Sequence, residues 1–500
     1  MFSLKEKITS NLILVVLFLA VMLFFGWLQF LTPTLYGFDA YYHVAVSRLI
    51  EDSGPLQNFR WAQFSTFKNF FSDKDFLLHV STIPFLYFTD NIVTAGKYAV
   101  VFFNFLFLLS FAFILRKYIP GFLTGLFLLL PALSPTFSMF FLYLRPTILA
   151  IILTIFLIYF LINKKWLGVL IVSIIYPLTH ISFLTVLVFA FFCEAIRYMH
   201  SKEIFERNIY VTIIGLGIGC IIHPNFPHNS ISVYLNAILV PWHTFVGTDI
   251  DFGREFIAVP TKQALISNFM VFFSLGMIIW FSFWKKVKVS FSSLVWFVCF
   301  GCYFVLAMLS NRYWYVVNPL FFVFFASYIN DVRGQVEWKE FTPKINRGVI
   351  VYFIAALFAM YPNCQMLKKD MSGYIEAGHH YENVALWMKN NIPSGETVYH
   401  ALWSDSPFFI CLNPKNNYVS VLDPIYTIYC CPGAYALYRG FKDGAVKDPH
   451  KVLKDVFGAR FGYAAGSTWL YQEALRDNAH FKVMYQDRYG IVFKLIDEKA

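Results

Sequence analysis

The sequence predicts a polytopic α-helical membrane protein with about 11 transmembrane helices and an exterior α/β domain at its C-terminal end. Of its 500 residues, 58% are hydrophobic and 14% are charged, whereas soluble globular proteins average about 45–50% apolar and about 25% charged residues. Apolar stretches of membrane-crossing length recur up to residue 364, and the composition then becomes ordinary. These observations exclude a purely soluble enzyme, a disordered protein and a disulfide-stapled secreted module.

The predicted spans follow from length, because about 20 mostly apolar residues cover the hydrocarbon core. They are 11–31, 94–115, 119–137, 144–162, 166–181, 183–198, 208–223, 264–284, 289–309, 312–329 and 348–364. The first follows Lys5 and Lys7, as the apolar part of a signal peptide would. It is too long for that part and no A-x-A cleavage site follows, so we expect it to remain as an anchor.

The orientation depends on segment 76–90, which is apolar but short and contains Pro84. If this segment does not cross and the N-terminus is cytoplasmic, the basic clusters between spans all become cytoplasmic, as the positive-inside rule requires. These clusters are Lys5/Lys7, Arg116/Lys117, Lys164/Lys165, Arg197/Lys202/Arg207, Lys285/Lys286/Lys288 and Arg333/Lys339/Lys344/Arg347. We therefore expect an interfacial helix at 76–90 and a periplasmic or extracellular C-terminus, in a cell membrane such as the bacterial inner membrane. The net charge of +10 then needs no nucleic-acid partner.

Two domains are predicted, a transmembrane catalytic domain at 1–364 and a soluble exterior α/β domain at 365–500. The first has a long exterior loop at 32–93 (the first loop) and a later one at 224–263 (the second loop). The eight cysteines have no CxxC pair or metal-like spacing, so neither a zinc nor a disulfide framework is expected. Cys430 and Cys431 are adjacent and do not readily pair with each other, which leaves Cys411 as the suggested partner for either.

Ionisable side chains gather at the predicted exterior ends of the spans and in the two loops. They are Lys97, Arg145, His180, His223 and Arg312 at span ends, Asp39, His43, Asp73, Asp75 and His79 in the first loop, and His228, His243, Asp249, Asp251, Arg254 and Glu255 in the second. Charges at the centre of a span cost about 2.5–3.5 kcal/mol on insertion scales, so such residues are usually functional. A transporter would place its site near the midplane. This pattern instead predicts a reaction at the outer leaflet, with an anionic lipid headgroup as one reactant.

A polyprenyl-phosphate sugar fits this description, since it carries a phosphate leaving group at the bilayer surface. Arginine or a divalent cation would stabilise the charge that develops on the phosphate. A carboxylate would take the proton of the attacking acceptor, or carboxylates would hold Mg²⁺ or Mn²⁺. The residue types leave open which carboxylate has which task.

Two segments resemble a known superfamily. G-F-D-A-Y-Y-H (Gly37–His43), directly after the first span, resembles the first exterior loop of GT-C superfamily glycosyltransferases, above all the D-x-Y-Y-H form of archaeal and bacterial oligosaccharyltransferase catalytic subunits. F-S-D-K-D-F-L-L-H-V-S-T-I-P-F (Phe71–Phe85) resembles the acidic stretch and juxtamembrane helix of protein mannosyltransferase-like and aminoarabinose transferase-like members. The resemblance is weaker at three further places: L-R-P-T (Leu144–Thr147), H-P-N-F-P (His223–Pro227) and Arg312.

The resemblance implies a GT-C-like fold and a glycosyltransferase whose donor is a polyprenyl-phosphate-linked sugar. Asp39 takes the position of the catalytic aspartate, a base or metal ligand, and Asp73 and Asp75 form a D-x-D-like pair of catalytic acids. The other implied site residues are Arg145 and Arg312 for the donor phosphate, His43, His79, His180, His223 and Glu255 in support, and Asp39, Asp75 and Glu255 for Mg²⁺ or Mn²⁺. The acceptor is a glycan, lipid or protein. Since the C-terminal domain lacks the W-W-D-Y-G motif, an acceptor other than an N-glycosylation sequon is favoured.

Other interpretations remain open. A lipid-linked glycan polymerase or ligase would share the outer-face site, and a lipid flippase or transporter would need no catalytic residues. Asp39 would be structural if it capped a helix at 40–50, as would Asp73 or Asp75 at the start of the 76–90 helix. The histidines would be packed core residues, and Arg145 and Arg312 interfacial anchors that snorkel to water.

Overall fold

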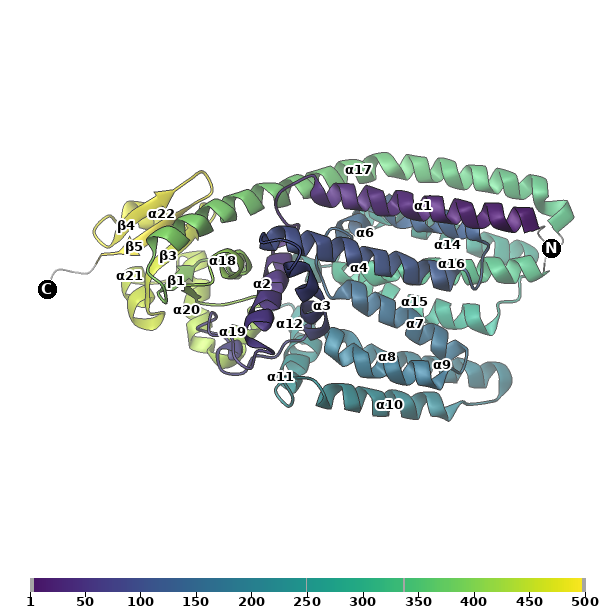
Figure 1. Ribbon diagram of the computed structural model, residues 1–500, viewed down its shortest axis with the longest axis horizontal. Helices are drawn as coiled ribbons and strands as arrows, with labels where there is room; N and C mark the ends of the chain where they lie inside the picture. Colours follow the sequence, from purple (N-terminus) through teal and green to yellow (C-terminus); the bar gives the residue numbers. More distant parts are fainter. Residues whose placement is uncertain (1–3, 249, 336–337, 497–500) are drawn as a thin grey trace. The chain divides into compact units, whose positions relative to one another are not determined.

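The computed structural model describes residues 4–248, 250–335 and 338–496, and it divides into two compact units. Unit 1 comprises Met1–Leu31, Tyr98–His223 and Gly253–Ser372. Unit 2 comprises Thr32–Lys97, Pro224–Phe252 and Gly373–Ala500. The first loop and most of the second therefore fold together with the C-terminal region. Figure 1 labels most of the helices and strands of both units.

Unit 1 is a helical bundle. Its α-helices are α1 (Leu4–Phe30), α4 (Ile92–Leu115, from Tyr98 on), α5 (Gly121–Leu129), α6 (Pro135–Phe140), α7 (Thr147–Ile162), α8 (Trp166–Thr179), α9 (Leu184–Ser201), α10 (Glu206–Ile221), α13 (Thr261–Ser267), α14 (Phe269–Lys285), α15 (Phe291–Leu309), α16 (Trp314–Gln335) and the first part of α17 (Trp338–Asn391). Short 3₁₀ turns link some of them: η2 (Leu130–Leu133), η3 (Ile181–Phe183), η5 (Arg254–Phe256) and η6 (Asn311–Tyr313).

Five helical segments are long and apolar enough to cross a membrane. They are Glu6–Phe30, Ile92–Leu115, Ile181–Ser201, Phe291–Leu309 and Asn311–Gln335. The pair α13 and α14, bent by 84°, adds a sixth if it counts as one span. Helices α7 and α8 are apolar but have only 16 and 14 residues, about 21–24 Å at 1.5 Å per residue. The chain is an integral membrane protein, and the number of eleven spans stays a prediction.

Small residues let the helices of this bundle approach closely. Gly215 and Gly219 lie one turn apart on α10, and a Cβ at either position would come within 2.6 Å of Ser173 Cβ or 2.4 Å of the Ile174 carbonyl oxygen on α8. In lipid there is no hydrophobic force between helices, so such small-xxx-small contacts allow the packing that holds them together. Gly121 and Gly125 of α5 meet α1 in the same way.

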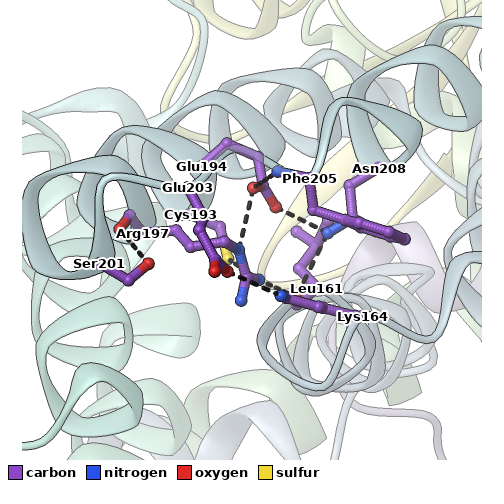
Figure 2. Close-up of polar contacts among 9 residues, drawn as sticks. All are labelled: Leu161, Lys164, Cys193, Glu194, Arg197, Ser201, Glu203, Phe205 and Asn208. Carbon is purple, nitrogen blue, oxygen red and sulfur yellow. Dashed lines mark hydrogen bonds and ion pairs between the residues drawn. The ribbon is translucent and has the colours of Figure 1, made fainter.

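A buried polar network joins the ends of α7 and α9 to the start of α10 (Figure 2). The Glu194 carboxylate accepts from Arg197 Nε (2.9 Å), the Phe205 backbone N–H (2.8 Å) and Asn208 Nδ2 (2.7 Å). Arg197 also donates to the Leu161 carbonyl at 2.7 Å. Glu194 and Arg197 are 2% and 6% exposed. Arg197, which the sequence suggests only as an orientation signal, therefore also has a structural task.

Unit 2 contains the helices of the two loops and the C-terminal α/β fold. From the loops come α2 (Phe38–Ser53), η1 (Thr66–Lys68), α3 (Phe76–Leu86), α11 (Asn229–Val233), the π-helix η4 (Tyr234–Leu239) and α12 (Val240–Val246). The C-terminal part has β1 (Thr397–His400), η7 (Trp403–Asp405), α18 (Ser406–Leu412), β2 (Asn417–Tyr418), α19 (Ile425–Cys430), α20 (Pro432–Asp443), α21 (Pro449–Lys451), the π-helix η8 (Val452–Val456), β3 (Ala459–Ala465), α22 (Trp469–Arg476), β4 (Phe481–Gln486) and β5 (Gly490–Leu495).

The predicted C-terminal α/β fold is confirmed. Its five strands lie in the order β2-β1-β3-β5-β4; β1 is parallel to β2 and β3, whereas β5 is antiparallel to β3 and β4. Tyr399, Phe441, Leu470 and Phe493 belong to its buried core. Helix α17 runs without a break through residue 364, and the domain boundary at that residue stays a prediction.

The first loop is bound to the edge of this sheet. Tyr418 of β2 donates its N–H to the Trp61 carbonyl (2.7 Å) and accepts from the Gln63 N–H (2.8 Å). Trp61 Nε1 donates to the Pro414 carbonyl at 2.6 Å. Because an unpaired strand edge presents free N–H and C=O groups, the loop satisfies this edge and is itself held in place.

One expected pairing of cysteines is wrong. Cys430 and Cys431 form a disulfide with each other, and Cys411 is a buried free thiol. Cys411 lies within α18 and is buried, whereas Cys430 ends α19 and Cys431 follows it directly.

A buried carboxyl group in unit 2 makes its stability depend on pH. Asp405 is fully buried and accepts hydrogen bonds from the Tyr381 hydroxyl and, at 3.2 Å, from the Leu402 N–H. Burial raises the pKa of this carboxyl to about 7, although the two hydrogen bonds lower it. A group whose pKa is raised by folding stabilises the fold below its unfolded pKa, and this contribution is lost as the pH rises through the folded pKa.

We therefore expect Asp405→Asn to change the pH profile of thermal unfolding. Between pH 5 and pH 8 the free energy of unfolding of the wild type should fall by about 2–4 kcal/mol relative to that of the variant, at about 1.4 kcal/mol per pKa unit. Melting temperatures of both proteins across this range measure the effect. The exposed Asp443, replaced in the same way, should leave the profile unchanged. A wild type that gains stability over Asp405→Asn with rising pH would contradict the assignment.

Candidate active site

Helix α2 is the next helix after α1 in the chain, and Gly37 is the residue at which it starts. Gly37 is the N-cap with φ of 81°, a conformation that favours glycine. Asp39 lies inside the first turn and is half-buried, and no side chain caps the helix. The interpretation of Asp39 as an N-cap is therefore wrong, because the turn at Gly37 starts the helix two residues earlier. Asp39 and His43 are four residues apart and so share one face of α2.

Helix α3, expected at 76–90, covers Phe76–Leu86. Its 11 residues are about 16 Å long, too short to cross the hydrocarbon core. Asp75 occupies the N-cap position without a side-chain cap hydrogen bond. Asp73 Oδ1 instead accepts from the Asp75 backbone N–H at 3.1 Å. Of the two acids, Asp73 thus supports the turn before α3, and Asp75 does not cap the helix.

Asp73 also begins a chain of hydrogen bonds that joins α3 to α2. Its Oδ2 lies 2.7 Å from His79 Nδ1, and His79 Nε2 lies 2.8 Å from His43 Nδ1. All three side chains are buried, with exposures of 3%, 0% and 4%. With Asp73 as acceptor, a neutral His79 donates from Nδ1 and accepts from the His43 N–H. This order of donors and acceptors fixes the orientation of the His79 and His43 rings.

The second loop holds this chain from the other side. The Asp73 backbone N–H donates to Asn225 Oδ1 (3.0 Å), and Asn225 Nδ2 donates to the Leu56 carbonyl (2.6 Å). Ser232 adds a hydrogen bond to the Ser72 carbonyl at 3.4 Å. In the H-P-N-F-P segment the sequence predicts its histidine, His223, as a site residue. The residue that contacts the acidic stretch is Asn225, and only the fold brings these segments together.

Asp75 differs from Asp73 in its surroundings. It is 4% exposed, and among the residues that the structure describes its carboxylate accepts no hydrogen bond. Burial raises its pKa to about 6; Lys74 and His79 lower it, whereas Asp73 and Asp39 raise it further. Asp39 and Asp75 therefore act on each other electrostatically. A buried carboxylate of this kind is suited to bind a proton or a cation.

Three of the predicted residues in unit 1, Arg145, Glu255 and Arg312, form a second group. Arg145 Nη1 lies 2.7 Å from Glu255 Oε2. The Arg312 guanidinium lies 4.4 Å from the ring centroid of Phe256, and Ser310 Oγ donates to the Glu255 carbonyl at 3.0 Å. Glu255 on η5 thus lies next to Arg312's turn η6 and is paired with Arg145, which precedes α7. Their part in donor binding stays a prediction.

The other histidines have local environments of their own. His180 caps η3, since its Nδ1 accepts from the Ser182 N–H (3.1 Å). His223 is buried, with 3% exposure, and is the last residue of the Tyr98–His223 segment of unit 1. Asp251 pairs with Lys442 at 3.1 Å on the surface, and Asp249 lies outside the described residues.

The chemistry of the acidic cluster fits a hard divalent cation. Asp39 and Asp75 offer carboxylate oxygens, which Mg²⁺ and Mn²⁺ prefer, and Mg²⁺ is commonly held by one or two carboxylates with water and substrate phosphate. Glu255, the third predicted ligand, belongs to the other unit. Within the described residues, three coordinating side chains gather at a different place, His450, Asp477 and His480. This group is not among the residues predicted from the sequence, in which the D-x-x-H spacing of Asp477 and His480 is the one pattern that points to it.

Comparison with known proteins gives a clear result only at the level of structure. No protein-family model matches the chain, and neither does the sequence of any curated protein. The apo oligosaccharyltransferase of Archaeoglobus fulgidus is similar, with a TM-score of 0.67 at 11% identity over 93% of this chain and 70% of that one. A structure of that organism's oligosaccharyltransferase AglB with an inhibitory peptide and a dolichol-phosphate has a TM-score of 0.66, at the same identity and coverage.

ArnT from Cupriavidus metallidurans, bound to undecaprenyl phosphate, is similar over almost the whole length of both chains. Its TM-score is 0.59 at 13% identity, over 96% of this chain and 97% of that one. Both neighbours are GT-C glycosyltransferases. The chain has a GT-C-like fold.

Proposed function

We propose that this protein is a glycosyltransferase that transfers a sugar from a polyprenyl-phosphate-linked donor to an acceptor at the outer, periplasmic face of the membrane. The observation that supports it most is the buried carboxylate of Asp75, which lacks a hydrogen bond from the described residues and is influenced by Asp39. Two structural neighbours were solved with a dolichol-phosphate or with undecaprenyl phosphate, which supports a phosphorylated polyprenol as donor.

In the proposed reaction the acceptor O–H or N–H attacks the anomeric carbon of the sugar. The bond from that carbon to the phosphate oxygen breaks, and its electron pair leaves with the lipid phosphate. Asp39 or Asp75 takes the acceptor's proton. Asp73 is a positioning residue, since it holds His79 and the turn before α3. A divalent cation on Asp39 and Asp75 would supply positive charge to the leaving phosphate.

Arginine stabilises phosphate well because its guanidinium makes two parallel hydrogen bonds. Arg145 and Arg312 are the residues proposed to bind the donor phosphate, and Arg145 is already paired with an anionic group, the Glu255 carboxylate. This role requires Arg145 to be held but not buried, and it is 15% exposed at its side chain.

The acceptor is proposed to be a glycan or lipid in preference to a protein sequon, since the C-terminal domain lacks W-W-D-Y-G. A lipid-linked glycan polymerase or ligase is the nearest alternative. The deciding experiment incubates purified protein with a panel of polyprenyl-phosphate sugars, with and without a chelator, and identifies products by mass spectrometry. Transfer from any of them supports the proposal. Movement of the lipid across vesicles without any product would favour a flippase.

Orientation is tested by single cysteines at the exposed positions Asn58, Arg116 and Ser394 in a background without reactive thiols. Labelling of positions 58 and 394 but not 116 by an impermeant reagent from outside is expected. A cytoplasmic position 58 would overturn the proposed outer-face reaction.

Replacement of Asp75 by asparagine is expected to abolish transfer and to stabilise the protein. The substitution removes a buried charge whose pKa is raised by about two units, which corresponds to about 3 kcal/mol at neutral pH. Measured transfer rate and melting temperature should therefore move in opposite directions. The exposed Asp90, replaced in the same way, should change neither. Loss of both activity and stability would show a structural role instead.

A further inference from the structure

A second polar cluster lies in the C-terminal sheet domain, on residues that the proposed reaction does not use. It consists of His450 on α21, Asp477 at the C-cap of α22 and His480 directly before β4. One coordinating atom from each lies within 4.8 Å of the others, and all three residues are partly exposed. The cluster is thus open to an ion from solvent.

The backbone fixes two of these side chains. Asp477 accepts the Phe481 N–H on its carbonyl at 3.0 Å, and the His480 carbonyl accepts from Ile496 at 2.9 Å. His480 Nδ1 lies 2.7 Å from Asp477 Oδ2. Turn and sheet therefore hold this imidazole and carboxylate together before any ligand arrives, which lowers the entropy cost of binding.

The third side chain comes from a separate segment. His450 is followed by η8, whose Leu453 is fully buried in the core of the sheet domain. The rings of His450 and His480 are stacked, with centroids 3.7 Å apart and planes 10° apart. The stacking thus brings the coordinating atoms of two separate segments of the chain to one place.

We propose that His450, Asp477 and His480 form a binding site for a late first-row divalent cation, represented by Zn²⁺. Two imidazoles and one carboxylate suit Zn²⁺ better than Mg²⁺ or Ca²⁺, which prefer oxygen ligands alone. When the ion takes the place of the proton between Asp477 Oδ2 and His480 Nδ1, Nε2 of the same neutral ring carries that proton, and no net proton is released. Water fills the remaining position of the tetrahedron. The bound ion ties α21 to the turn between α22 and β4.

The test uses tag-free, full-length protein in detergent, stripped with a chelator and titrated with Zn²⁺ against a chromophoric competitor. We expect one site per chain, weakened at least about tenfold in His450→Ala, His480→Ala and Asp477→Asn, in line with the loss when metal-site residues are removed. The control is His379→Ala, since His379 is half-exposed on α17 and lies 3.9 Å from Glu382. Zn²⁺ should also raise the melting temperature of the wild type and the control, but not of the ligand variants.

Equal Zn²⁺ binding by the wild type and the ligand variants would overturn the proposal, as would no binding by the wild type. If the Asp477 or His480 variant fails to fold, His450→Asn, on the three-residue helix α21, is used to test the site in its place. Asp39→Asn and Asp75→Asn should keep this Zn²⁺ site, which separates it from a cation at the candidate active site. Titration with Mg²⁺ should show no competition.

Discussion

Replacing Asp39 by asparagine is expected to lower the rate of sugar transfer at least about 100-fold while the protein remains folded. General acid–base catalysis contributes about 10²–10⁴-fold, and a cation ligand would be lost by the same change. Asp39 is half-buried and caps no helix, so its removal leaves the start of α2 at Gly37 intact. The rate is measured with the donor that supports turnover, and folding by melting temperature.

The matched control for this experiment lies on the same helix. Asp52 is exposed near the C-terminal end of α2, and Asp52→Asn should keep wild-type activity. Full activity of purified Asp39→Asn would refute the assignment of Asp39. A comparable loss in both variants would indicate that α2 itself, and not its first carboxylate, is sensitive.

Replacing Glu194 by alanine is expected to destabilise the helical bundle by about 3–5 kcal/mol, the cost of removing one partner of a buried ion pair. The variant leaves Arg197, Asn208 and the Phe205 N–H without their shared acceptor (Figure 2). The melting temperature should fall by about 10 °C, since each kcal/mol corresponds to about 2–4 °C in a domain of 150–250 residues. Thermal unfolding followed by intrinsic fluorescence measures it.

Glu203 provides the comparison, because it is 68% exposed and pairs with Lys164 at 3.5 Å in the same view. An exposed pair is worth about 0–1 kcal/mol, so Glu203→Ala should change the melting temperature little. Glu194→Gln keeps the side-chain oxygen and should fall between the two. If Glu194→Ala melted like Glu203→Ala, the buried network would not stabilise the bundle.

The sequence by itself determined the class of protein and the outline of its fold. Apolar stretches and their flanking charges depend on local composition, so an apolar helical region, the short helix before the second long one and the C-terminal α/β region could be predicted. The G-F-D-A-Y-Y-H segment located Asp39 in the same way, since a motif is contiguous in the chain. The number of spans was harder, because α13 and α14 bend by 84° and α7 and α8 are short.

Only the tertiary structure decided what the candidate residues contact. Asp73 and Asp75 are equivalent in sequence, yet one is bonded to His79 and Asn225 and the other has a buried carboxylate with a raised pKa. Asn225 lies 152 residues from Asp73, and the three residues of the proposed zinc site span a sheet edge and two helices. Hydrogen bonding and burial depend on segments far apart in the chain, and a linear pattern carries no record of such pairings.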